Sequence, residues 1–247
     1  MQDSNRELFK PITIIYFSTI AAQLISLGLG RIDTTSHFLS NLLPSLLFLT
    51  ILTIPSAWIG IKLGRLIGLG VPIIDALLGK KAGAIRQLIK DVLIASILGF
   101  TMGAILLVMR FVCEPYLPSE IPRLGHRGIV GGLSVSFGAA IAEEVWFRLG
   151  LMTLLVWIFK YILSQQVPSN AVFWGVIVIT STCFGIAHLP QLISYEAGTS
   201  FAVWATLLGN ILVGILYGWC YWKRSLIAAV VAHLTVDLVL HVLSVTL

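Results

Sequence analysis

The stretch that decides the fold is GIVGGLSVSFGAAIAEEVWFRLGLMTLLVWIFKYILS, residues 128–164. It is apolar over far more than the roughly 17–25 residues that one membrane-spanning helix needs. Glu143, Glu144 and Arg148 nevertheless lie near its middle. A charged side chain at bilayer depth costs at least about 2.5–3.5 kcal/mol on insertion scales, so it usually faces a protein interior and serves a function. The stretch therefore predicts two short membrane helices that meet near the acidic pair.

The composition of the whole chain also indicates a membrane protein. Of its 247 residues, 57% are hydrophobic and only 11% are charged, and the mean hydropathy is +0.97, whereas a soluble domain carries about 25% charged residues. Further apolar runs long enough to span a bilayer cover residues 11–30, 38–61, 92–109, 171–187, 200–222 and 225–247. The sequence thus predicts an all-α, polytopic integral membrane bundle of about eight helices. We expect one domain over residues 1–247, with the chemistry in residues 128–247.

The positive charge is distributed in a way that indicates membrane topology. A net charge of +5 would suggest a nucleic-acid partner in a soluble protein, but here the basic residues cluster between the predicted spans. Residues 62–90 carry six Lys and Arg residues and one acid, Asp75, which predicts a cytoplasmic loop with an amphipathic interfacial segment. Eight spans then put both termini in the cytoplasm, although Lys223 and Arg224 fall outside. We expect contacts with membrane lipids and none with nucleic acid.

Six ionisable residues inside the predicted spans form three clusters. They are Glu143, Glu144 and Arg148 in IAEEVWFRLG, His188 in CFGIAHLP, and His233 with Asp237 in VAHLTVD. On a helix Glu144 and Arg148 share a face and can pair, whereas Glu143 points about 100° away and stays available as a general base. Each cluster alone has a structural explanation: a buried ion pair, an interfacial histidine or an interhelical hydrogen bond. Three clusters together favour a catalytic site.

In chain order these motifs resemble the CPBP family of intramembrane endopeptidases, the CAAX protease and bacteriocin-processing or Abi family. It includes the type II CAAX prenyl proteases of the Ras-converting type. The resemblance rests on Glu143-Glu144-x-x-x-Arg148, Phe184-x-x-x-His188 and His233-x-x-x-Asp237, and on Phe147-Arg148-Leu149 where the family often has Phe-Arg-Gly. It implies hydrolysis of peptide bonds in membrane-bound or prenylated, CAAX-type polypeptides. The bacterial relatives also make a bacterial plasma membrane the expected location.

The resemblance assigns a role to each motif. Glu143 would act with His188 to activate the attacking water, and Glu144 with Arg148 would support that site. His233 and residue 237 would stabilise the oxyanion. Asp237 is a departure, because many relatives have Asn there and an ionised carboxylate repels an oxyanion. It would have to be protonated, bind a metal or orient His233.

Metal dependence stays open at the level of sequence. A catalytic zinc ion takes three protein ligands and a water, and His188 and His233 with Asp237 or Glu143 offer such a set. The chain lacks an HExxH motif, so we favour a metal-free glutamate mechanism and keep zinc as the alternative.

Two other functions fit the same residues. One is a non-proteolytic bacteriocin self-immunity protein or membrane partner of the same fold. The other is a proton-coupled transporter, in which Glu, His and Asp form a proton relay. A transporter predicts inverted repeats, whereas the ionisable clusters of this chain occur only in its second half.

Overall fold

The computed structural model describes residues 2–29 and 35–246, with side chains for 8–28 and 42–246. The predicted span ends at Gly30 and Leu247 lie outside the described residues. Every described element is helical. In chain order they are α1 (Gln2–Leu29), α2 (Thr35–Ile67), α3 (Pro72–Leu78), α4 (Ala84–Cys113), η1 (Glu114–Tyr116), α5 (Gly128–Glu143), η2 (Glu144–Met152), α6 (Thr153–Ile162), α7 (Asn170–Ala187), α8 (Leu189–Ser194), α9 (Ser200–Lys223), α10 (Leu226–Asp237), η3 (Leu238–Val242) and η4 (Leu243–Thr246). Of these, η2 and η3 are π-helices.

Seven helical segments in the described part of the chain are long and apolar enough to cross a membrane. They are Leu8–Gly28, Leu42–Ile67, Ala84–Tyr116, Gly128–Ile162, Asn170–Ser194, Ser200–Lys223 and Leu226–Thr246. The predicted all-α membrane bundle is thereby confirmed, with one span fewer than the expected eight.

The difference comes from residues 128–164, where two short helices were expected. The structure instead has one continuous helical segment, in which α5, η2 and α6 follow each other without a break. The chain stays helical through the charged residues because Glu144 and Arg148 are paired inside the protein. A break at that depth would leave backbone N–H and C=O groups without water as a partner.

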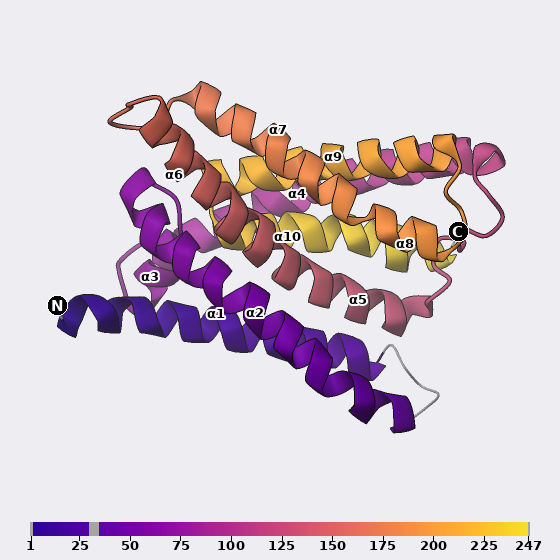
Figure 1. The fold of residues 1–247 in the computed structure, drawn as a ribbon, viewed down its shortest axis with the longest axis horizontal. Helices are drawn as coiled ribbons and strands as arrows, with labels where there is room; N and C mark the ends of the chain where they lie inside the picture. The colour runs from indigo at the N-terminus through magenta and orange to yellow at the C-terminus, as the bar shows by residue number, and fades with distance from the viewer. Residues whose placement is uncertain (1, 30–34, 247) are drawn as a thin grey trace.

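An odd number of spans changes the predicted topology. The two termini lie at opposite ends of the bundle (Figure 1), not on the same side. With seven spans, Lys223 and Arg224 lie at the same end as the 62–90 loop. Eight spans had placed these two basic residues outside the cytoplasm, against the positive-inside rule. Among the described side chains, that end carries Lys10, Lys62, Arg65, Lys80, Lys81, Arg86, Lys90, Lys160, Lys223 and Arg224, whereas the opposite end carries Arg110, Arg123 and Arg127. We call the first the basic end, and the positive-inside rule predicts that it faces the cytoplasm.

Two tryptophans near the basic end fit an interfacial position. The ammonium of Lys62 lies 4.5 Å from the ring centre of Trp58, and that of Lys223 lies 3.5 Å from the ring centre of Trp222. Aromatic rings and snorkelling lysines of this kind are enriched where a helix leaves the hydrocarbon region. The short helix α3 is the candidate for the interfacial segment that the sequence predicted in this loop.

Close helix packing fixes the helices that carry the candidate site. Helices α4 and α10 lie side by side, as do α7 and α9 (Figure 1). At Gly99 of α4 an added Cβ would lie 2.6 Å from the Ala232 carbonyl oxygen, so α10 can approach this closely only because the residue is glycine. At Gly60 of α2 an added Cβ would lie 2.2 Å from the Leu149 carbonyl oxygen of η2. Small residues at such crossings are typical of membrane bundles, since helix association there depends on close packing.

Candidate active site

The six predicted residues come from three segments of the bundle. Glu143 ends α5, and Glu144 and Arg148 follow in the π-helix η2. His188 caps the C-terminus of α7, and His233 and Asp237 lie one turn apart on α10. These segments meet in the interior, and the packing of α7 and α10 on η2 brings the three motifs together.

A buried triad connects two of the motifs. Glu144 Oε2 lies 3.2 Å from Arg148 Nε, and both side chains are 0% exposed. The other carboxylate oxygen, Glu144 Oε1, lies 2.9 Å from His233 Nδ1. A carboxylate can only accept here, so His233 donates from Nδ1, and in its neutral form the Nε2 atom is left without a proton. One fully buried carboxylate therefore holds both a guanidinium and an imidazole.

Two further carboxylates face the other ring nitrogen of His233. Its Nε2 atom lies 3.6 Å from Asp237 Oδ2 and 3.9 Å from Glu143 Oε2. Both distances exceed that of a hydrogen bond. Glu143 is the most accessible of the three acids, with 25% of its side chain exposed against 14% for Asp237. Glu143 thus lies in the site without being held by Arg148.

His188 joins this group through the Phe184 ring. The Nδ1 atom of His188 donates to the Phe184 carbonyl oxygen over 2.8 Å, so neutral His188 also has an unprotonated Nε2. The Phe184 ring centre lies 4.6 Å from that of His188 and 6.0 Å from that of His233. His188 is close enough to Glu143 for an electrostatic interaction.

Arg148 is held largely by acceptors and aromatic faces within the bundle. Its Nη2 donates to the Gly214 carbonyl oxygen over 3.1 Å, and its Cζ lies 4.8 Å from the Phe184 ring centre. Within the described part of the chain, Nη1 has no hydrogen-bond partner. A buried guanidinium in this position needs the Glu144 charge, because desolvating an unpaired cation is expensive.

The π-helix η2 is anchored by hydrogen bonds at Trp146, between Glu144 and Arg148, and at Thr153, the first residue of α6. Trp146 Nε1 donates to Thr53 Oγ1 of α2 over 3.0 Å. Thr153 Oγ1 donates to the Arg148 carbonyl oxygen over 3.3 Å and lies 2.8 Å from the Tyr221 hydroxyl. Such irregular turns are rare and occur often at functional sites, because they re-aim side chains that an α-helix would place elsewhere.

Three buried polar residues were missed by the sequence analysis. Tyr217 stacks on His233, and Tyr221 accepts from the Gly70 N–H over 3.0 Å. Asp91 is fully buried and accepts from Ser225 over 3.0 Å, at the start of the helix that carries His233. Nothing in their spacing marks them, since Tyr217 and Tyr221 lie in an ordinary apolar run. Gln87 also donates to Asp91, over 2.8 Å. The spacing of four residues between Gln87 and Asp91 was the one signal in the sequence that could have pointed to Asp91.

The family comparison covers the segment that contains the candidate site. Residues 126–239 match the family model of the Rce1-like type II CAAX prenyl endopeptidases. Over this segment, a little less than half of the chain, the protein is similar to that family. The matched segment contains all six predicted site residues and confirms the resemblance drawn from the three motifs. No curated protein and no solved structure matches the chain.

The similarity to the Rce1-like family indicates a class of protein and not a specific activity. Proteins of this family are generally proteases, and the family also includes non-proteolytic members. Together with the seven apolar helices, the match supports an integral, multi-pass membrane protein that resembles a protease family over residues 126–239.

The described side chains do not fit a catalytic zinc ion. Among them, no group of three or more His, Cys, Asp or Glu residues is arranged to hold a metal, whereas catalytic zinc requires three protein ligands. The reaction proposed for this site therefore uses protein side chains alone.

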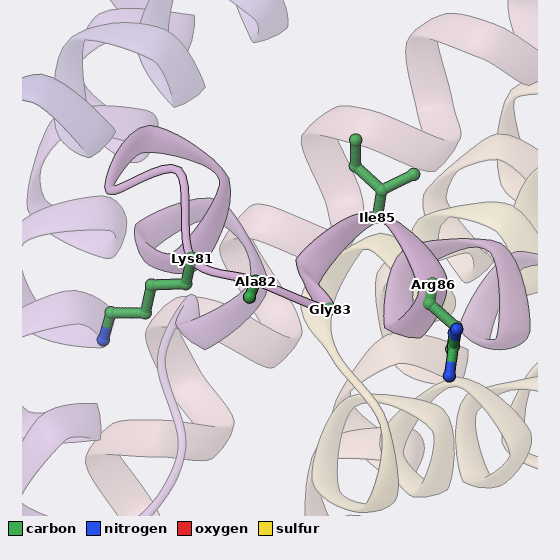
Figure 2. Close-up of a pocket in the computed structure, with 5 residues that line it drawn as sticks. All are labelled: Lys81, Ala82, Gly83, Ile85 and Arg86. Atoms are coloured by element: carbon green, nitrogen blue, oxygen red, sulfur yellow. The ribbon is translucent and has the colours of Figure 1, made fainter.

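A pocket at the basic end is distinct from this site. It has a volume of about 670 Å³ and is lined by Lys81, Ala82, Gly83, Ile85 and Arg86, where the loop after α3 enters α4 (Figure 2). None of the six predicted residues lines it. The pocket therefore takes no part in the chemistry of those six residues.

Proposed function

We propose that this protein is an intramembrane endopeptidase that hydrolyses peptide bonds of membrane-bound or lipid-modified polypeptides with a glutamate/histidine site. The observation that carries the proposal is the separation of roles between two adjacent glutamates. Glu144 is fully buried between Arg148 and His233. Glu143 is partly exposed beside the same histidine, and no arginine among the described side chains pairs with it. A carboxylate left free in this way suits a general base.

In the proposed reaction Glu143 takes a proton from a water molecule as the water oxygen attacks the scissile carbonyl carbon. The neutral His188, with its bare Nε2, accepts a hydrogen bond from the same water and orients it. One positioned base of this kind contributes typically about 10²–10⁴-fold. The attack forms a tetrahedral intermediate whose oxyanion must then be stabilised.

His233 is the proposed donor to the oxyanion. Its Nδ1–H is fixed on Glu144, so the imidazolium form presents Nε2–H on the side of the ring that faces Glu143 and Asp237. Removing one oxyanion donor costs about 10²–10³-fold in other hydrolases. Asp237, 3.6 Å from Nε2, acts in this scheme by orienting the imidazolium. Collapse of the intermediate breaks the C–N bond, and the proton held by Glu143 passes to the leaving amine.

The test is cleavage of a membrane-inserted peptide by the purified full chain in lipid nanodiscs. Glu143→Gln keeps the shape of the side chain and removes the base, so we expect turnover to fall by at least about 10²-fold. Glu120→Gln is the matched control, because Glu120 is an exposed glutamate in the loop before α5. Wild-type protein that cleaves no member of a broad panel of prenylated and unmodified membrane peptides would instead support the non-proteolytic alternative.

A further inference from the structure

We infer that Tyr217 is a positioning residue of this site, whose ring holds the His233 imidazole in the orientation that catalysis needs. The inference rests on the proposed endopeptidase function and adds a residue from α9, which carries none of the three motifs. Tyr217 is 1% exposed and points into the interior among the site residues.

The contact between the two rings is a face-to-face stack. Their centres lie 4.5 Å apart and their planes are inclined by only 11°. A histidine side chain changes the direction of its two nitrogens by rotating about its Cβ–Cγ bond. A flat ring at van der Waals distance along one face blocks that rotation, because the turning imidazole would have to pass through it.

A second aromatic ring limits the movement of His233 from another direction. The Phe184 ring stands at 87° to the imidazole, with the centres 6.0 Å apart. Phe184 also meets Tyr217 nearly at a right angle, with the centres 6.3 Å apart. The hydrogen bond from His233 to Glu144 fixes one nitrogen, and these rings fix the plane in which the other nitrogen lies.

The ring of Tyr217 also lies near the guanidinium of Arg148 and the imidazole of His233, which carries a positive charge in the proposed donor form. The Arg148 Cζ lies 5.3 Å from its ring centre, and the protonated form of His233 stacks on it. The negative face of an aromatic ring attracts cations, and this attraction is strongest where water is excluded. The Tyr217 ring therefore helps to stabilise the positive charge of the His233 imidazolium, although the permanently charged Arg148 lies nearby.

It is the ring of Tyr217, and not its hydroxyl, that makes these contacts. The described residues include no hydrogen-bond partner for the Tyr217 hydroxyl. Tyr221, one turn further along α9 and 3% exposed, shows the opposite arrangement. Its hydroxyl accepts from the Gly70 N–H and bonds Thr153, so it connects the loop before α3 to the end of η2. The same helix thus supplies a matched control.

The first measurement is steady-state cleavage of a membrane peptide by full-length variants in nanodiscs. Tyr217→Phe keeps the ring and should retain most of the wild-type kcat. Tyr217→Leu removes the stack and should lower kcat by about 10²-fold with little change in KM, since a small misplacement of a catalytic group costs about that much. Tyr221→Phe should lower the melting temperature, whereas Tyr217→Phe should not. A Tyr217→Leu enzyme with wild-type kcat, or a Tyr217→Phe enzyme as impaired as Tyr217→Leu, would overturn the inference.

A second measurement tests the same point without catalysis. In ¹⁵N-histidine-labelled protein in bilayers, the His233 signals are assigned by their loss in His233→Gln. We expect Tyr217→Phe to keep their wild-type positions and Tyr217→Leu to shift or broaden them by exchange. Unchanged His233 signals in Tyr217→Leu would contradict the positioning role even if no substrate were cleaved. Absence of cleavage together with the expected signals would count against the proposed function alone.

Discussion

Replacing Glu144 with alanine should destabilise the fold far more than the same change at Glu143. Glu144 is 0% exposed and holds Arg148 at 3.2 Å and His233 at 2.9 Å, so its loss leaves a buried guanidinium without its counter-charge. Removing one member of a buried ion pair costs about 3–5 kcal/mol. Glu143 has 25% of its side chain exposed, and its carboxylate lies 3.9 Å from His233 Nε2, beyond hydrogen-bond distance. Its replacement should cost about 1 kcal/mol or less.

The assay is thermal unfolding of the purified variants in detergent, followed by tryptophan fluorescence. For a chain of this size about 1 kcal/mol corresponds to roughly 2–4 °C, so the Glu144→Ala melting temperature should fall by roughly 6–20 °C and that of Glu143→Ala by a few degrees. Arg148→Ala in the Glu144→Ala background should restore part of the loss, because the unpaired charge is then gone. Equal shifts for the two glutamate variants, or no recovery in the double variant, would refute this division between a structural and a catalytic glutamate.

Three further outcomes are expected. Asp237→Asn should retain much of the cleavage activity, because the amide keeps the shape of the side chain and can still orient His233. If the variant loses activity, and a chelator inhibits the enzyme in a way that zinc reverses, the metal-free reaction is contradicted. A reporter that is active only outside the cytoplasm should be active when fused after residue 247 and inactive when fused in the 62–90 loop, as seven spans and the positive-inside rule require. Gly99→Val should lower both the melting temperature and kcat, because the Cβ of the valine would collide with the carbonyl oxygen of Ala232, the residue before His233. The control Gly175→Val should change neither, because the space around its Cβ is open.

The sequence by itself determined the class of the protein and located the candidate site residues. Hydropathy is a local property, so the apolar runs identified the membrane helices directly. The pairing of Glu144 with Arg148 was predictable for the same reason, since residues four apart on one helix are neighbours whatever the rest of the chain does. The order of the three motifs predicted the resemblance that the Rce1-like family model bears out over residues 126–239.

Only the tertiary structure decided how those residues are connected. His233 was expected to work with Asp237 on its own helix, but its hydrogen bond goes to Glu144, 89 positions earlier. Residues 128–162 form one helical span, and its Glu144 and Arg148 also contact His233 of α10 and the Gly214 carbonyl oxygen of α9, which no local pattern reveals. The contact of Tyr217 with His233 depends on the packing of α9 against α10, so the sequence did not indicate it. Contacts between distant residues depend on how the helices pack, and that packing is set by the shape of all the buried side chains together.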